Sequence, residues 1–183
     1  WEAPFGNDPA TNDYYVDDGF NTGDLYTPGA VGSDANDGRT INSPKRTLTN
    51  LLSTYDLDPG DTVYVDTGTN TYQVRILSAD ADGTVASPIT FVGPTNGSVA
   101  TFRGLIGWKD GWLVTNAVNI RIRAMTFQAY SNGIRVRGAS TNILVFGNTL
   151  RSNALIGVCL EGENVDGNRI VSNRADGAGV QVR

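Results

Sequence analysis

The sequence predicts an all-β fold, a parallel β-helix (solenoid) in which short strands stack in successive coils, with one short capping helix near the N-terminus. Three observations predict it. Apolar strand motifs recur about every 22 residues in the second half, asparagine and glycine recur at the turns between them, and a single segment shows helical periodicity. A coil of this size cannot bury its apolar side alone, so neighbouring coils must stack and share one core.

The repeat is clearest in four segments that each begin with glycine. They are residues 111–114, 133–136, 157–160 and 179–182, spaced by 22, 24 and 22 residues. A second register aligns residues 119–122 with residues 142–145. A third aligns positions 20 residues apart: Asn148 with Asn168, Leu150 with Ile170, and Asn153 with Asn173. Because an asparagine amide both donates and accepts, recurring asparagines predict a hydrogen-bonded ladder at one corner.

Residues 44–55 carry the helical pattern. Ser43 is the expected N-cap and Pro44 the expected first helical residue. The apolar side chains fall at i, i+3, i+4 and i+7, which places them on one face: Leu48, Leu51, Leu52 and Tyr55. We therefore expect this helix to cap the N-terminal end of the coils.

The chain divides into three parts. Residues 1–13 form a polar arm, residues 14–60 an N-terminal cap of strand, Asp/Gly loop and helix, and residues 61–183 the coils, with the C-terminal end open. The chain begins at Trp1 without a methionine or an apolar leader, and we interpret it as a piece of a longer precursor. An open last coil exposes unpaired strand edges, so a downstream portion or a second subunit is expected to cover it.

Composition excludes several classes of function. None of the 183 residues belongs to an apolar run of 18, so no membrane span is expected. Cys159 is the single cysteine, which rules out an internal disulfide and a zinc finger. The chain has no histidine, which removes histidine-based triads, histidine metal sites and the usual general base near neutral pH.

Charge is distributed unevenly along the chain. Residues 1–90 have a net charge of −10 and residues 91–183 a net charge of +5, the positive charge being almost all arginine. This asymmetry favours head-to-tail self-association, or an arginine-rich face for an acidic polysaccharide. An ordinary solvated surface is the alternative. Nucleic acid is not expected as a partner because the protein as a whole is acidic.

Several segments resemble a known family. Residues 14–17, 32–38 and 42–48 are similar to the N-terminal cap of pectate-lyase-like right-handed parallel β-helix proteins, and residues 59–65 and 87–93 to their first coils. The resemblance implies a right-handed, single-stranded solenoid that is secreted to the cell surface or the medium. The family includes lyases and epimerases of acidic polysaccharides. It also includes β-helix repeat domains of large bacterial surface proteins without shown catalysis.

The repeat also predicts a candidate ligand site, because alternate strand residues point outward. One outward column contains Arg135, and the next contains Thr115, Arg137, Glu161 and Arg183. We predict that Arg135, Arg137, Glu161 and Arg183 bind an anionic sugar, with a surface salt-bridge ladder as the alternative.

Catalysis by this chain alone is not favoured. The resemblance implies Ca²⁺ or arginine to neutralise a uronate carboxylate and lysine or arginine to abstract the proton. The repeats lack lysine and a dense outward carboxylate cluster. Glu161 and Glu163 are glycosidase candidates by residue type only, because Glu163 falls at a corner. We therefore predict no catalytic residues.

The cap contains an acidic loop that suggests calcium. Asp34, Asn36 and Asp37 match part of an oxygen-rich Ca²⁺ loop, although no bidentate glutamate follows. Further acidic and amide side chains lie in the same loop: Asp17, Asp18, Asn21 and Asp24. A structural Ca²⁺ is one interpretation. Asx turns, in which these side chains bond to nearby backbone, are the other.

Three functions follow from these features. The favoured one is a non-catalytic extracellular structural module, from a surface protein or a self-assembling filament. The second is a lyase or epimerase acting on acidic polysaccharide. The third is a carbohydrate-binding module that uses Arg135 and Arg137 with aromatics such as Tyr130 and Phe146.

Overall fold

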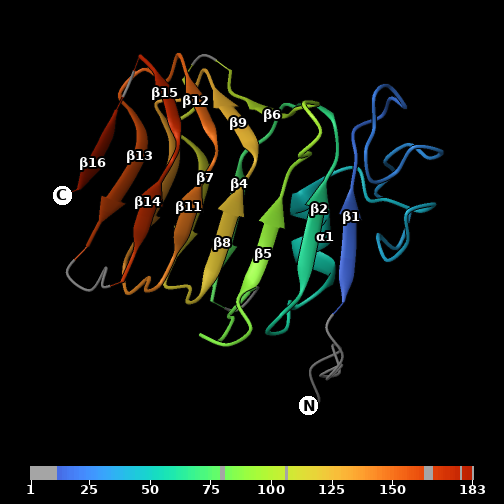
Figure 1. The fold of residues 1–183 in the computed structure, drawn as a ribbon, viewed down its shortest axis with the longest axis horizontal. Helices are drawn as coiled ribbons and strands as arrows, with labels where there is room; N and C mark the ends of the chain where they lie inside the picture. Colours follow the sequence, from blue (N-terminus) through green and yellow to red (C-terminus); the bar gives the residue numbers. More distant parts are fainter. Residues whose placement is uncertain (1–11, 79–80, 106, 163–166, 178, 183) are drawn as a thin grey trace.

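We analysed a computed structural model, which describes residues 12–78, 81–105, 107–162, 167–177 and 179–182. These residues form one helix and sixteen strands, divided among three parallel sheets (Figure 1). The first sheet has the order β1 (Asp13–Val16), β2 (Thr62–Val65), β5 (Ile89–Val92), β8 (Ile120–Arg123), β11 (Leu144–Phe146) and β14 (Arg169–Val171).

The other two sheets have five strands each. The second has the order β3 (Gly68–Asn70), β6 (Ala100–Arg103), β9 (Met125–Gln128), β12 (Thr149–Arg151) and β15 (Arg174–Asp176). The third has the order β4 (Val74–Leu77), β7 (Asp110–Thr115), β10 (Asn132–Arg137), β13 (Ile156–Glu161) and β16 (Val180–Val182). From β2 onward, each turn of chain adds one strand to every sheet.

The predicted fold class needs correction. The sequence predicted a single-stranded right-handed parallel β-helix that closes into one solenoid. This prediction is wrong as stated, because the described strands fall into three separate sheets beside one helix. Turns with left-handed backbone separate the strands, and they recur at equivalent places, as at Ala124, Gly147 and Ser172. The observed arrangement is consistent with a β-solenoid-like fold.

The strand registers of the third sheet are confirmed. Trp112, Ile134, Val158 and Val180 occupy equivalent positions on β7, β10, β13 and β16. In the first sheet, Ile122 pairs with Val145 as the second register predicts. Register follows the apolar pattern because a slip of one residue would turn every buried side chain outward.

The third predicted register, with its 20-residue spacing, is wrong. Leu150 pairs with Ala175, and Ile170 pairs with Val145. The amide of Asn148 donates to the side-chain oxygen of Asn173 at 3.1 Å. The asparagine ladder therefore exists, but its members are 25 residues apart because that turn of chain is longer than the sequence pattern indicated.

The core lies between the three sheets. Trp112 is fully buried and packs edge-on against three aromatic rings, with centroid distances of 5.5 Å to Phe91, 5.0 Å to Phe102 and 5.5 Å to Phe127. Phe91 belongs to the first sheet and Phe102 to the second, so this cluster joins all three sheets.

The helix is shorter than predicted. It is α1 (Leu48–Thr54), and its N-cap is Thr47, whose hydroxyl accepts from Asn50 N at 3.1 Å. Ser43 and Pro44 are not its first residues, because Lys45 is extended against β1: its N–H donates to Tyr15 O at 2.9 Å. The predicted apolar face is confirmed, since Leu48, Leu51 and Leu52 are buried.

The structure describes little of the predicted N-terminal arm. Of the predicted arm, residues 1–11 lie outside the described residues, and Asp13 already begins β1. Within the described part of the chain, no helix is long and apolar enough to cross a membrane.

Candidate functional site

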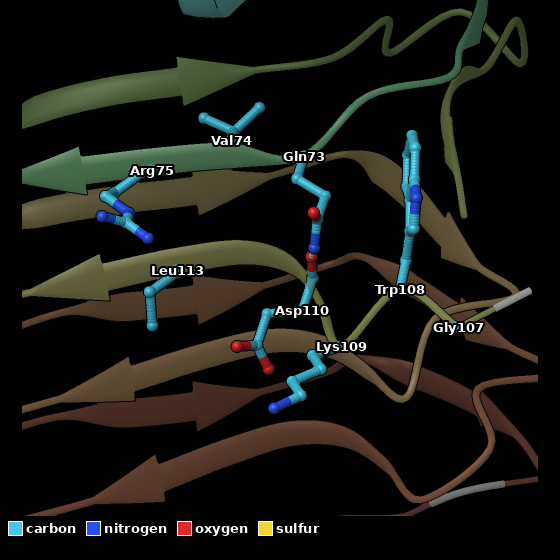
Figure 2. A pocket seen from close by; sticks show the side chains of 8 residues that line it. All are labelled: Gln73, Val74, Arg75, Gly107, Trp108, Lys109, Asp110 and Leu113. Atoms are coloured by element: carbon cyan, nitrogen blue, oxygen red, sulfur yellow. Dashed lines mark hydrogen bonds between the residues drawn. The ribbon is translucent and has the colours of Figure 1, made fainter. Parts of the chain in front are cut away.

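A pocket of about 400 Å³ lies over the beginnings of β4 and β7 (Figure 2). We call it the Trp108 pocket. It is lined by Gln73, Val74, Arg75, Gly107, Trp108, Lys109, Asp110 and Leu113. Its volume falls within the range of roughly 300–1,000 Å³ that is typical of small-ligand sites.

Trp108 is held by the turn that precedes β7. Its N–H donates to Leu105 O, and its carbonyl accepts from Ser131 N, both at 3.1 Å. The indole stacks on the buried ring of Tyr130, with a centroid distance of 6.2 Å and an interplanar angle of 24°. The Tyr130 hydroxyl in turn donates to Tyr72 O at 2.8 Å. Trp108 is therefore fixed in place while it remains only partly buried beside the pocket.

Asp110 forms the charged floor of the site. Its side chain is 12% exposed, and its Oδ1 accepts from the Asn132 amide at 2.7 Å. Its Oδ2 pairs with Arg135 Nη1 at 3.3 Å. Arg135 Nε lies 3.2 Å from Glu161 Oε2, an ion pair without hydrogen-bond geometry. One guanidinium thus links two carboxylates across β7, β10 and β13.

Cations surround these carboxylates. Arg75 and Arg135 both align with Leu113 on β7, from the two strands that flank it. Because neighbouring strands are about 4.8 Å apart, the two arginines start roughly 10 Å from each other across the sheet. Lys109 is exposed at the pocket edge, as Figure 2 shows. Trp108, Arg75 and Lys109 line the same pocket, so the site presents an aromatic ring and two positive charges.

The predicted ligand residues are only partly brought together. Arg135 and Glu161 meet, and Arg137 aligns with Glu161 on the neighbouring strand as expected. Among the described residues, however, the ion pair of Glu161 is with Arg135 and not with Arg137 of its own column. Arg183 and Glu163 lie outside the described residues.

Sequence reasoning missed Arg75, Trp108, Lys109 and Asp110. The sequence contained one signal for Asp110. A polar residue stands directly before the leading glycine of the repeat in two successive strands, Asp110 on β7 and Asn132 on β10. Trp108 lies two residues before Asp110, as Tyr130 lies two residues before Asn132 in the next repeat. This recurring aromatic was a signal for Trp108, whereas Lys109 corresponds to Ser131 and had no such signal.

The predicted calcium residues Asp34, Asn36 and Asp37 each have protein partners. Asp34 Oδ1 accepts from Thr47 N at 2.9 Å, and the Asn36 amide donates to Pro44 O at 2.8 Å. Asp37 Oδ1 accepts from Ser43 Oγ at 2.6 Å and, as an Asx turn, from Arg39 N at 3.0 Å. The bond from Ser43, then that from the Arg39 N–H, lowers the pKa of Asp37.

The Asp37 bond to Arg39 N is an Asx turn, whereas Asp34 and Asn36 bond to the more distant residues Thr47 and Pro44. Among the residues that the structure describes, no group of three or more His, Cys, Asp or Glu side chains is arranged to hold a metal ion.

Comparison with known proteins gives a similarity to a solved structure. No family model and no curated protein matches the chain. Among solved structures, the chain is similar to a GH136 lacto-N-biosidase from Eubacterium ramulus, with a TM-score of 0.53 and 13% sequence identity. The similarity covers 93% of this chain and 43% of that enzyme, so the chain spans less than half of its neighbour. At this identity the likeness concerns the fold alone.

Proposed function

We propose that this chain is a non-catalytic carbohydrate-binding domain of an extracellular protein, and that the Trp108 pocket binds an acidic oligosaccharide. The observation that carries the proposal is the partly buried indole of Trp108, held by Tyr130 beside Arg75 and Lys109. An aromatic ring among fixed polar groups is the usual composition of a small-ligand site.

The chemistry of the pocket suits a uronate-containing sugar. The apolar face of a sugar ring packs on an indole, which combines a large apolar surface with a polar edge. Guanidinium groups pair with carboxylates through two parallel hydrogen bonds, so Arg75, which lines the pocket, suits an acid group of the ligand. Asp110, which also lines the pocket, supplies acceptors for sugar hydroxyls.

The same geometry argues against glycoside hydrolysis in this pocket. A glycosidase leaves the space between its two carboxylates free for the sugar and a water molecule. Between Asp110 and Glu161 that space contains the Arg135 guanidinium, within 3.3 Å of one carboxylate and 3.2 Å of the other. The carboxylates therefore hold Arg135 in place, which favours binding over catalysis.

The structural neighbour supports a carbohydrate ligand, since a lacto-N-biosidase is by its name a carbohydrate-active enzyme. Location outside the cell and membership of the pectate-lyase-like group are part of this proposal and rest on the sequence resemblance. Self-assembly into filaments, the function that the sequence favoured, stays a prediction. We prefer binding because the Trp108 pocket is a formed site on the described surface.

Isothermal titration with oligogalacturonate, alginate and chondroitin oligosaccharides tests this proposal. We expect one of them to bind, and Arg75→Ala to weaken that binding at least tenfold, because the variant loses a charged hydrogen-bond donor that lines the pocket. Arg121→Ala is the matched control, since Arg121 is an exposed arginine on β8 of the first sheet. Equal affinity in both variants would remove the pocket from consideration, and release of unsaturated uronide would show catalysis instead.

A further inference from the structure

Two carboxylates near the end of β1 have no protein partner. Asp17 directly follows β1 and is 1% exposed, yet neither of its carboxylate oxygens has a hydrogen-bond partner. Both carboxylate oxygens of Asp24 are likewise shielded from solvent and unpartnered. A buried, unpaired carboxylate costs several kcal/mol, so such groups in proteins are normally paired or coordinate a metal ion.

The loop of residues 18–27 brings these carboxylates toward each other. Asp66, at the end of β2, donates its N–H to Val16 O at 2.8 Å, next to Asp17. The carboxylate of Asp66 accepts from the backbone N–H groups of Leu25, Tyr26 and Thr27 at 2.8, 2.7 and 2.7 Å. Asp66 therefore holds the loop against the ends of β1 and β2. After burial, repulsion from Asp24 is the largest cause that raises the pKa of Asp17, so the two carboxylates lie near each other.

The other two acids of this region have partners. Asp66 is saturated by its backbone donors. Asp18 accepts from Phe20 N at 2.8 Å through one oxygen and from Thr69 N at 3.2 Å through the other. Asp17 and Asp24 thus differ from their neighbours, because their four oxygens are buried and have no partner with hydrogen-bond geometry. The backbone N–H groups of Asp18 and Thr22 lie near enough to lower the pKa of Asp17 and Asp24, but this effect is smaller than those that raise the two values.

The electrostatic environment agrees with this geometry. Burial, followed by repulsion from Asp24, Asp18 and Asp66, raises the pKa of Asp17 to about 8. Burial, followed by repulsion from Asp66 and Asp18, raises the pKa of Asp24 to about 6. Every charge that acts on Asp17 is another carboxylate, so a cation is the complement that this region lacks.

We propose that Asp17 and Asp24 bind one calcium ion, which fastens the 18–27 loop to the ends of β1 and β2. Calcium takes six to eight oxygen ligands and accepts backbone carbonyls and water beside carboxylates. That mixed set suits a site with two carboxylates, those of Asp17 and Asp24, in which backbone carbonyls and water supply the remaining ligands. Zinc is not favoured, since it prefers four nitrogen or sulfur ligands. This site is separate from the Trp108 pocket and does not depend on the proposed function.

Calorimetric titration of the metal-free protein with CaCl₂ is the first test, with thermal unfolding in CaCl₂, MgCl₂ and EDTA beside it. We expect one bound Ca²⁺ per chain and a rise in Tm of about 5–10 °C at saturating Ca²⁺, because only the folded state binds. Absence of both the binding heat and the Tm shift would overturn the proposal. An equal shift with Mg²⁺ would overturn the assignment to calcium.

Asp17→Asn separates binding from misfolding. In EDTA the variant is expected to be about as stable as the wild type, because its amide is an uncharged isostere of a carboxyl whose pKa of about 8 keeps it protonated at neutral pH without metal. Ca²⁺ should no longer raise the Tm of the variant. Asp24→Asn should also lose the calcium response, and it provides the test if Asp17→Asn does not fold. Asp34→Asn is the matched control, because Asp34 bonds to Thr47, and its calcium response should equal that of the wild type. Loss of the response in Asp34→Asn alone would move the site to the loop around residue 34.

Discussion

Replacing Trp112 with alanine is expected to lower the free energy of unfolding by about 3–5 kcal/mol, the usual loss for a large buried aromatic. Trp112 is fully buried and contacts one aromatic ring from the first sheet and two from the second. No smaller side chain fills that space, so the three sheets lose their shared contact. Urea unfolding followed by circular dichroism measures the loss.

Trp108→Ala is the matched control for Trp112→Ala. Its indole is only partly buried and packs on Tyr130 at the edge of the fold, so we expect a loss of about 1 kcal/mol or less. Equal destabilisation by the two substitutions would show that the core does not centre on Trp112.

Asn148→Ala is expected to cost about 2–4 kcal/mol, because it leaves buried backbone groups without partners. Asn148 is 1% exposed; its oxygen accepts from Met125 N at 3.1 Å and its amide donates to Ile122 O at 2.9 Å. The same amide donates to Asn173 in the next turn of chain. One side chain therefore satisfies three groups that alanine cannot reach.

The comparison variant for Asn148→Ala is Asn96→Ala. Asn96 is exposed and accepts only a local bond from Ser98 N at 3.0 Å, so its replacement should change the free energy of unfolding by less than about 1 kcal/mol. If Asn148→Ala were equally mild in urea unfolding, the asparagine ladder would not be a source of stability.

The sequence was most informative about strand pairing. The apolar alternation and the leading glycines were sufficient to align Trp112 with Ile134, Val158 and Val180, because burial on one side fixes the register. The same pattern did not show where the chain turns between strands. It therefore predicted one single-stranded solenoid rather than three sheets.

The residue spacing of the repeats predicted the wrong pairs where the turns vary in length. Asn148 was aligned with Asn168 on a 20-residue spacing, whereas it bonds to Asn173. The helix start was also misplaced, since Ser43 and Pro44 form a good N-terminal signal on their own. Pairing of Lys45 with Tyr15 on β1, a contact distant in sequence, outweighs that local preference.

The candidate sites were less predictable than the fold. Arg135 and Glu161 were found because they lie on the repeated strands, while Trp108 lies in the turn before β7, outside the strand pattern. The calcium prediction pointed to Asp34, Asn36 and Asp37, which have local partners, and the unpartnered carboxylates are Asp17 and Asp24. A sequence pattern identifies acidic loops, but only the contacts show which oxygens remain unpaired.

The central claim, that the Trp108 pocket binds an acidic oligosaccharide, is tested most directly by nuclear magnetic resonance. The chain has three tryptophans, Trp1, Trp108 and Trp112, and therefore three indole N–H signals, of which Trp108→Ala identifies one. On titration with oligogalacturonate, alginate or chondroitin oligosaccharides, we predict that the Trp108 signal shifts while that of the buried Trp112 does not. A Trp108 signal unmoved by saturating amounts of all three would contradict the account.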